Sequence, residues 1–200
     1  INTDNGCEAS ASVTVVGDGN LPMAVANLLG ALDCVNTIAT LDATGSSIGP
    51  AFEYLWTTTD GNILGDPTSV NPEIDAPGTY LIEVTNTTNG CTSSASVQVM
   101  VNTDLPIVIG NVNGILDCQN GTVTIDATGS DTGSDFTYEW ETITGNITAG
   151  QNEFTATVNA SGDYILTVTN ETNGCAAQDT VTVGQATGAP FIAIAIPDTL

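Results

Sequence analysis

The sequence contains no lysine, arginine or histidine, although 23 of its 200 residues are aspartate or glutamate. Side-chain salt bridges therefore cannot form, and neither can Schiff-base lysines, arginine clamps, histidine general bases or lysine isopeptide crosslinks. Nucleic acids and anionic membranes are not expected partners, because both are bound through lysine and arginine. Proteases that cleave after lysine or arginine find no site in the chain.

Long apolar runs and helical spacing of apolar residues are missing as well. No apolar run reaches the ~18 residues of a membrane-spanning helix, so direct membrane insertion is not expected. The five cysteines include no C-x-x-C pair. Because histidine is absent too, a zinc site is not expected, and the chain is predicted to need no cofactor, with calcium as the one candidate ion.

What the sequence does contain is a repeat of 84 residues. "TNTTNGC" ends at Cys91 and "TNETNGC" ends at Cys175, and a truncated form, "NTDNGC", ends at Cys7. Residues 21–104 align with residues 105–188 without a gap, and 35 of the 84 aligned residues are identical. Such a repeat predicts two copies of one structural module.

The repeat also gives the expected domain boundaries. Residues 21–104 and 105–188 are the two complete modules, and residues 1–20 match the C-terminal end of such a module. Residues 189–200 match the start of one and are interpreted as the first strand of a following repeat. The alternative for this apolar segment is a donor strand that inserts into another subunit.

Each module is predicted to be an all-β, antiparallel β-sandwich. Apolar residues alternate with polar ones in short runs such as 52–56 and 136–140, and glycine-containing turns separate the runs. Threonine and valine, which favour strands, dominate these runs. The aromatic residues share a face with the aliphatic core positions, so four of them are predicted to be core residues: Trp56, Trp140, Tyr80 and Tyr164.

The repeated heptad is predicted to be the hairpin between the last two strands of each module. Its Asn-Gly pair supplies the positive φ of a tight turn, and its cysteine begins the closing strand. In the first module the closing strand is expected over 94–101, with Val97, Val99 and Val101 facing the core.

The segments "LDATGS", "FEYLW", "APGTY" and "NGC" of the first module, read in that order, resemble immunoglobulin-like and PKD-like repeats. Such repeats occur in very long Bacteroidota surface proteins, including gliding-motility-type adhesins exported by the type IX route. The resemblance implies secretion, tandem β-sandwiches, a stalk or adhesin role and no catalytic residues. It leaves one difference: antibody-type domains place a cysteine two residues after the corner tyrosine, whereas this sequence has Ile82 and Leu166 there.

The cysteines allow several pairings. Within modules, Cys34 pairs with Cys91 and Cys118 with Cys175; this is the main prediction, because a self-contained module suits two cysteines per repeat. Immunoglobulin topology places those pairs at opposite ends of the sandwich, which favours the alternative Cys34–Cys175. Bonds between successive cysteines (Cys7–Cys34 and Cys91–Cys118) and free thiols are the remaining options.

Two aspartate positions recur in both modules and are the only candidate metal ligands. They are Asp33 with Asp117 and Asp42 with Asp126. Carboxylate oxygens suit calcium, but no D-x-D-x-D-G loop accompanies them, so turn formation and solvation are the competing interpretation.

The sequence also bears on two other kinds of site, glycosylation and catalysis. Thr180 and Thr199 lie in Asp-Thr-Val and Asp-Thr-Leu triplets, which resemble a Bacteroidota O-glycosylation pattern. Glu139 and Glu141 are not placed around a cleft, so we expect no glycosidase pair and no enzymatic activity.

The sequence thus predicts a structural or adhesive repeat segment of a long extracellular protein, resistant to proteases. Its expected partners are neighbouring repeats of the same protein and other copies in a filament. The alternatives are an accessory carbohydrate-binding module of a secreted enzyme and a strand-exchanged, pilus-like subunit.

Overall fold

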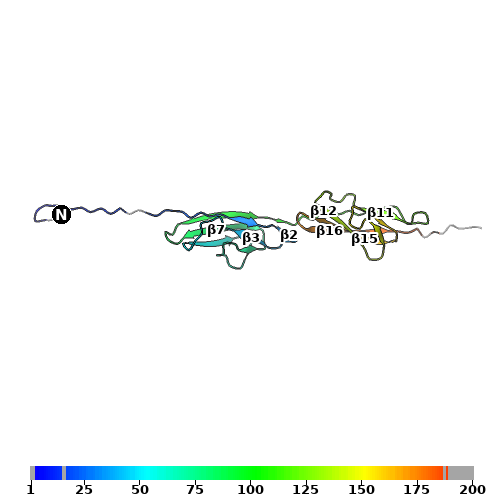
Figure 1. The fold of residues 1–200 in the computed structure, drawn as a ribbon, viewed down its shortest axis with the longest axis horizontal. Helices are drawn as coiled ribbons and strands as arrows, with labels where there is room; N and C mark the ends of the chain where they lie inside the picture. Colours follow the sequence, from blue (N-terminus) through cyan, green and yellow to red (C-terminus); the bar gives the residue numbers. More distant parts are fainter. Residues whose placement is uncertain (1–2, 15–16, 187, 189–200) are drawn as a thin grey trace, which may run out of the picture. The chain divides into compact units, whose positions relative to one another are not determined.

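The computed structural model describes residues 3–14, 17–186 and 188 (Figure 1). These residues form strands and turns only, and none of them forms a helix of the length and apolarity that crossing a bilayer demands. The chain divides into two compact units. Unit 1 comprises residues 1–32 and 38–100, and unit 2 comprises residues 33–37 and 101–200.

Unit 1 consists of two antiparallel sheets. The four-stranded sheet has the order β1-β3-β6-β5 and the three-stranded sheet has the order β4-β7-β8. The strands of the first sheet are β1 (Asn27–Leu29), β3 (Ala39–Asp42), β6 (Glu73–Ile74) and β5 (Ile63–Leu64). Those of the second sheet are β4 (Phe52–Thr58), β7 (Gly78–Asn86) and β8 (Thr92–Val99).

Unit 2 repeats this arrangement. Its sheets have the orders β10-β11-β14-β13 and β12-β15-β16. The strands of the first are β10 (Asn111–Asn113), β11 (Val123–Asp126), β14 (Thr155–Val158) and β13 (Ile147–Ala149). Those of the second are β12 (Phe136–Thr142), β15 (Gly162–Asn170) and β16 (Cys175–Val183). A separate two-stranded sheet contains β2 (Leu32–Asp33) and β9 (Val101–Asn102).

Alternation along the strands builds a core between the two sheets of each unit. In β15 the side chains of Tyr164, Leu166 and Val168 are fully buried, and the residues between them are only partly buried. The four aromatic residues that the sequence places in the core are buried, with relative exposures of 1 % for Trp56 and 0 % for Trp140, Tyr80 and Tyr164.

The closing strand of unit 1 ends earlier than predicted. It spans Thr92–Val99, Val99 is buried and Val97 packs against the core, but Val101 is 43 % exposed. Val101 belongs instead to β9, the partner of β2. The period-two pattern of valines continues across this break between strands, which is why the pattern alone extended the strand too far.

A buried tyrosine fixes the corner before each of the long strands β7 and β15. The Tyr80 hydroxyl donates to the carbonyl of Ala76 (2.6 Å) and accepts the backbone N–H of Asn62 (2.9 Å). The Tyr164 hydroxyl makes the same bond to Ala160 (2.6 Å). Hydroxyls satisfied in this way can lie next to an apolar core without a desolvation penalty.

The strand order identifies the fold class. Labelled A to G along the chain, the seven strands of each unit form sheets ABED and CFG, the constant-type immunoglobulin arrangement. A buried tryptophan on strand C and the tyrosine corner complete it. The protein therefore contains tandem immunoglobulin-like β-sandwich units, in which aliphatic Ile82 and Leu166 occupy the position of the second core cysteine.

Candidate functional site: the Cys34–Cys175 disulfide

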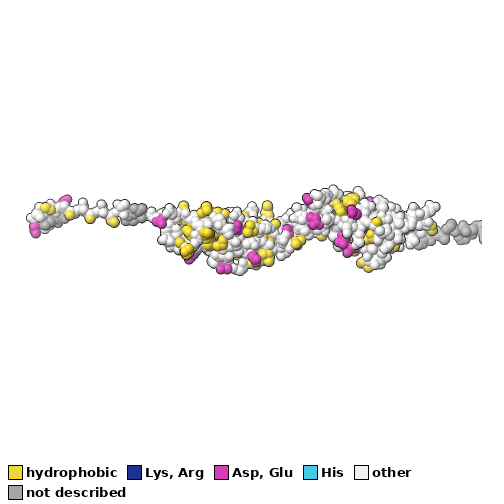
Figure 2. Space-filling view, in the orientation of Figure 1, with side chains coloured by type: hydrophobic (Ala, Val, Ile, Leu, Met, Phe, Trp, Pro, Cys, Tyr) yellow, Lys and Arg dark blue, Asp and Glu magenta, His cyan; other side chains and the backbone are white. Residues whose placement is uncertain are grey.

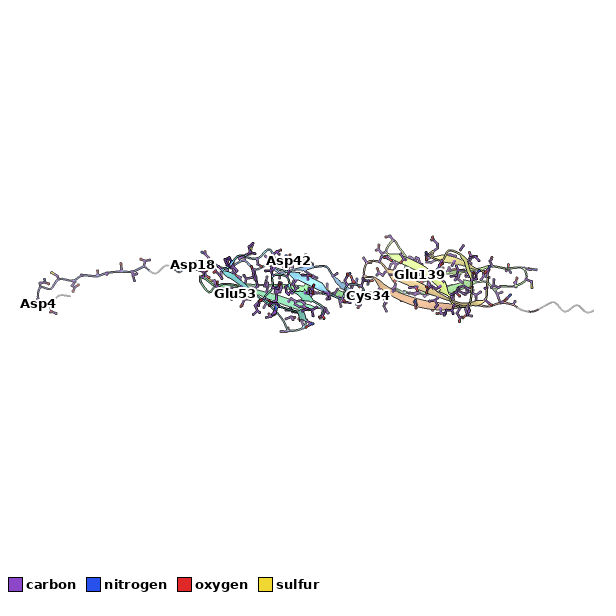
Figure 3. All side chains as sticks on the ribbon, turned by 60° about the horizontal axis from the view of Figure 1, so that its bottom comes forward. Asp4, Asp18, Cys34, Asp42, Glu53 and Glu139 are labelled. Carbon is purple, nitrogen blue, oxygen red and sulfur yellow. A yellow bond between two sulfur atoms is a disulfide. The ribbon has the colours of Figure 1, made fainter. Side chains whose placement is uncertain are left out.

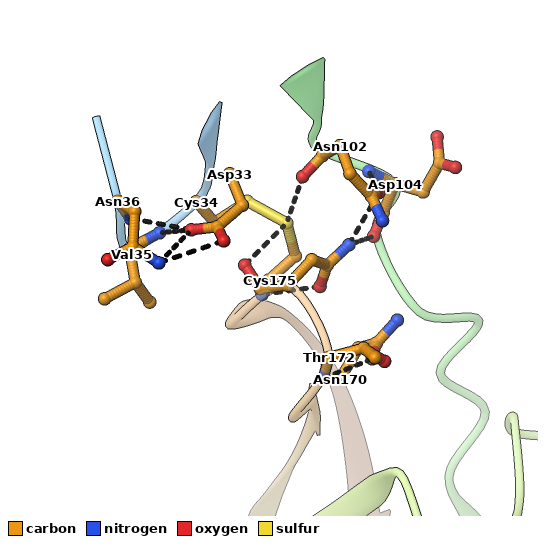
Figure 4. The surroundings of a disulfide bond; sticks show 10 residues. Asp33, Cys34, Val35, Asn36, Asn102, Asp104, Asn170, Thr172 and Cys175 are labelled. Atoms are coloured by element: carbon orange, nitrogen blue, oxygen red, sulfur yellow. Dashed lines mark hydrogen bonds between the residues drawn. A yellow bond between two sulfur atoms is a disulfide. The ribbon is translucent and has the colours of Figure 1, made fainter. Parts of the chain in front are cut away.

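The structure contains one disulfide among the described residues, and it joins Cys34 to Cys175 (Figure 4). Its Cα atoms are 5.1 Å apart, and the two cysteines lie 141 positions apart in the sequence. Cys34 lies in the segment 33–37 that belongs to unit 2, and Cys175 begins strand β16. The prediction of pairs within modules, Cys34–Cys91 and Cys118–Cys175, was wrong: Cys91 and Cys118 are free, as is Cys7.

The topology of unit 2 explains why pairs within a module do not form. Leu116, two residues before Cys118, forms a parallel bridge with Gln185, beyond the end of β16. Cys175 lies at the start of that strand, ten residues earlier in the chain. At ~3.3 Å per residue this separation is about 30 Å, whereas a disulfide requires Cα atoms within ~7 Å.

Asn173 organises the hairpin that carries Cys175. Its side chain is buried (2 % exposed), and its Nδ2 donates to the side-chain oxygen of Asn102 (2.9 Å) and the carbonyl of Asp104 (3.0 Å). Its Oδ1 accepts the N–H of Cys175 (3.0 Å), and its carbonyl accepts the N–H of Cys34 (3.2 Å). One asparagine thus links the hairpin, the chain segment beside it and the incoming loop.

The turn itself differs from a two-residue Asn-Gly turn. Gly174 has a φ of +65° and Gly90 one of +71°, but no non-glycine residue among those described has a positive φ. The asparagine before each glycine contributes its side chain to the turn instead of a left-handed backbone. Sequence reasoning treated Asn173 as a turn former and missed its role at the disulfide; the recurrence of both heptad asparagines in the two full copies was the available signal.

The loop that carries Cys34 is shaped by Asp33. The Asp33 Oδ1 accepts the backbone N–H groups of Val35 (3.0 Å) and Asn36 (2.6 Å), and the side-chain amide of Asn36 bonds to both carboxylate oxygens. These bonds, led by the one from the Asn36 backbone, favour the charged form and lower the pKa of Asp33. Asp33 is therefore a loop-forming residue in this structure.

The other calcium candidates have similar local roles. Asp117 accepts the N–H groups of Gln119 and Asn120, each at 2.7 Å, and the Asn120 backbone bond is the main cause of its lowered pKa. Asp42 accepts the N–H of Thr44 (2.9 Å), which lowers its pKa.

Asp126, the equivalent of Asp42, accepts the N–H of Thr128 (2.8 Å) and the side-chain amides of Asn111 and Asn113. The bonds from Thr128, its side chain first, are the main causes of its lowered pKa. Within the described part of the chain, no three histidine, cysteine or acidic residues are grouped so as to hold a metal ion. The four aspartates therefore form no such group among the described residues, and calcium binding stays a prediction.

The remaining candidate residues are placed as follows. Thr180 is exposed on β16, and Thr199 and the proposed donor strand 189–200 lie outside the described residues. Glu53 and Glu139 are exposed on β4 and β12 (Figure 3), and Glu141 is exposed as well. Acidic side chains are scattered over the face seen in Figure 2.

Known proteins resemble the chain only at the level of solved structures with low sequence identity. No family model and no curated protein matches the chain. Among solved structures, the three N-terminal domains of the bacteriophage RB49 outer capsid protein Hoc match with a TM-score of 0.46 and 14% identity, over 82% of this chain and 59% of that one. Murine CEACAM1b (TM-score 0.34, 15% identity) matches over 82% of this chain and 100% of that one.

A bacterial surface-layer structure is similar at the same level. Domains 7, 8 and 9 of the S-layer protein SbsC match with a TM-score of 0.34 and 12% identity, over 86% of this chain and 64% of that one. The assignment to the immunoglobulin-like fold class rests on the strand order and the tyrosine corners described above.

Proposed function

We propose that the chain is a structural, load-bearing segment of a long extracellular surface protein and that it performs no enzymatic reaction. The Cys34–Cys175 disulfide carries the proposal. It joins a residue of the first sequence repeat to the last hairpin of the second, so it crosses the repeat boundary instead of stapling one module. A bond of this kind changes how tension travels along the chain.

Tension applied to the two ends takes the shortest covalent path. That path runs from the N-terminal segment to Cys34, across the sulfur atoms to Cys175 and on to the C-terminus. Residues 35–174 form a closed loop outside this path, and the loop contains all of the strands from β3 to β15. Most of both β-sandwiches is thereby protected from being pulled out by force.

Chain composition supports an extracellular location and a stalk role. Disulfides persist mainly in oxidising compartments outside the cytosol. The formal charge of −23 favours solubility and repulsion between neighbouring chains, and the missing lysine and arginine remove the sites of trypsin-like proteases. The resemblance to Bacteroidota surface repeats supports the finer proposal of an adhesin stalk with neighbouring repeats as its partners.

Single-molecule stretching between the two termini tests the proposal. The oxidised chain should extend only through the residues outside the loop. Reduction, or the Cys34→Ser variant, should release the loop between Cys34 and Cys175 and add about 500 Å of contour length. Cys118→Ser is the matched control, because it removes an exposed, unbonded thiol. Equal contour lengths with and without the disulfide would show that the bond does not carry load.

A further inference from the structure

Cys91 and Cys118 are the repeat equivalents of the two bonded cysteines. In the repeat alignment Cys118 corresponds to Cys34, on the loop, and Cys91 corresponds to Cys175, on the hairpin. We infer that both thiols are sites of further disulfides in the same register, in which the loop cysteine of one repeat bonds to the hairpin cysteine of the next repeat along the same chain. Cys91 thereby takes the loop of a preceding repeat, and Cys118 takes the hairpin of a following one.

The inference rests on the proposed function, because it needs the chain to be a segment of a longer array of these repeats. The observation that carries it is the Cys34–Cys175 bond, which joins the loop of one repeat to the hairpin of the next. A second observation is that the unbonded loop and the unbonded hairpin already have the local shape of their bonded equivalents.

The hairpin around Cys91 has the hydrogen bonds of the bonded hairpin. The N–H of Cys91 donates to Asn89 Oδ1 (3.0 Å), and Asn89 Nδ2 donates to the carbonyl of Asn20 (3.0 Å). The Cys91 sulfur lies 4.0 Å from the carbonyl oxygen of Asp18. At the bonded hairpin, the corresponding distances around Cys175 are 3.0, 3.0 and 3.9 Å. The hairpin of unit 1 is therefore shaped before any loop binds to it.

The surface that the loop covers in unit 2 is open in unit 1. A Cβ atom added to Gly174 would collide with the side chain of Val35 from the loop, whereas one added to Gly90 would meet no atom of the described residues within 4 Å. Cys175 is buried under the loop (1 % exposed), but Cys91 is only partly buried. The hairpin of unit 1 thus has the free space that such a loop occupies.

The loop around Cys118 already has the shape of the bonded loop. The N–H of Asp117 donates to the carbonyl of Asn120 (3.1 Å), as that of Asp33 does to Asn36 (3.0 Å). The Asp117 carboxylate accepts two backbone N–H groups and the Asn120 side-chain amide, the same set that Asp33 accepts. Cys118 is exposed in this loop, so its thiol is accessible to a following hairpin.

Successive bonds of this register overlap along the chain. The Cys34–Cys175 bond spans 141 positions, whereas the repeat is 84 residues long. Between the first and the last bond of such an array, every residue therefore lies within at least one disulfide-closed loop. Cys7 fits the series, because its N–H donates to Asn5 Oδ1 (3.1 Å) as the other hairpin cysteines do to their asparagines.

Each bond needs an oxidant of the disulfide class, for which glutathione disulfide serves. The loop thiolate attacks one glutathione sulfur, forms a mixed disulfide and releases one glutathione thiolate. The hairpin thiolate then attacks the loop sulfur and displaces the second glutathione thiolate. Two protein thiols are oxidised to one disulfide while one glutathione disulfide is reduced to two thiols, and the protons of the protein thiols reach the glutathione thiolates through water.

The test uses the whole chain extended by one repeat. A second copy of residues 105–188, inserted at the start of the first complete repeat, places a Cys118 loop before the Cys91 hairpin, in the order in which Cys34 precedes Cys175. After refolding with glutathione disulfide, cleavage after acidic residues and mass spectrometry should recover the peptide pairs Cys91–Cys118 and Cys34–Cys175. Pairs within modules would instead give Cys34–Cys91 and Cys118–Cys175, so the two registers differ in mass.

The unextended chain is the matched control. Cys91 should react with a small thiol reagent in the unextended chain and lose that reactivity in the extended one, which should run as a monomer on non-reducing electrophoresis. Hydrogen exchange at Asn89 should fall toward that at Asn173 in the extended chain, because the loop then covers the hairpin. A Cys91→Ser change in the extended chain should leave the inserted Cys118 reactive.

Three results would overturn the inference: pairs within modules, a Cys91 that stays reactive in the extended chain, and Cys91–Cys118 pairs confined to linked oligomers. The stretching experiment on the unextended chain tests the load-bearing role separately, through the contour length released from the Cys34–Cys175 bond. The expected peptide pairs without a change in contour length would refute the load-bearing role alone, and the reverse result would refute the repeated register alone.

Discussion

Unit 1 and unit 2 share their strand order but differ at the hairpin before the closing strand. In unit 2 Asn173 and Cys175 are buried, while in unit 1 Asn89 and Cys91 are partly exposed. The local hydrogen bonds of the two hairpins are the same. The hairpin sequence therefore determines the shape of the hairpin, whereas the loop that carries Cys34 determines whether the hairpin is buried.

The two cores differ at the tryptophan of strand C. Trp140 Nε1 donates to the carbonyl of Glu153 (3.2 Å), but the buried Trp56 Nε1 has no hydrogen-bond partner. Tyr138 also packs edge-on against Phe154, with ring centroids 5.3 Å apart, where unit 1 has Val70 in place of the phenylalanine. The core of unit 2 thus has a tryptophan hydrogen bond and an aromatic contact that the core of unit 1 does not have.

The largest expected effect comes from removing the disulfide. In the chain-entropy account, closing a loop of 141 residues stabilises the folded chain by about 5 kcal/mol. Cys34→Ser should therefore lower the melting temperature well below that of the control Cys118→Ser, and Cys91→Ser should behave like the control. Calorimetry measures all three, and hydrogen exchange at Asn173 should rise toward that at Asn89. Equal melting temperatures for the three variants would contradict the asymmetry between the units.

The tyrosine corners should respond alike. Tyr80→Phe and Tyr164→Phe each remove a hydroxyl that donates to a backbone carbonyl at 2.6 Å. Each change should destabilise its own unit by about 1–3 kcal/mol, because a polar backbone group loses its partner. Denaturant unfolding, followed unit by unit through NMR, gives the two values. Two values that differ by more than the width of this range would mean that the corners are not equivalent.

The tryptophans should respond differently. Trp140→Phe loses packing and the bond to Glu153, while Trp56→Phe loses packing and removes an unsatisfied buried donor. The Trp140 change should therefore be the more damaging by about 1 kcal/mol. Comparing the melting transitions of the two variants by calorimetry measures the difference, and equal losses would show that the Glu153 bond contributes nothing.

The smallest expected effect is a change in strand β10 when Asp126 is protonated at low pH. The pKa of Asp126 is lowered from 3.8, chiefly by the Thr128 side chain, so its charged form stabilises the fold above that value. This contribution disappears as the pH falls below 3.8 through the folded pKa. Because Asn111 and Asn113 of β10 donate to Asp126, NMR signals of β10 should shift in that range. In the Asp126→Asn variant those shifts should be absent.

Most of the fold follows from the sequence, because alternating residues such as those of β12 and β15 leave little choice of buried face. The disulfide followed only as the alternative to the pairs within modules, since its two cysteines lie 141 positions apart in the sequence and their proximity depends on tertiary structure. Strand ends needed the structure too, as Val101 shows. The role of Asn173 was hidden because its neighbours, Asn102 and Asp104, come from another part of the chain.

The Cys34–Cys175 bond also makes the protein tolerant of damage. A single cut in the backbone anywhere from residue 35 to residue 174 opens the loop but leaves the two flanking tails joined through sulfur. A nicked molecule of this kind stays in one covalent piece until the disulfide is reduced, so the ends of the chain remain tethered after a cleavage that would sever an ordinary polypeptide.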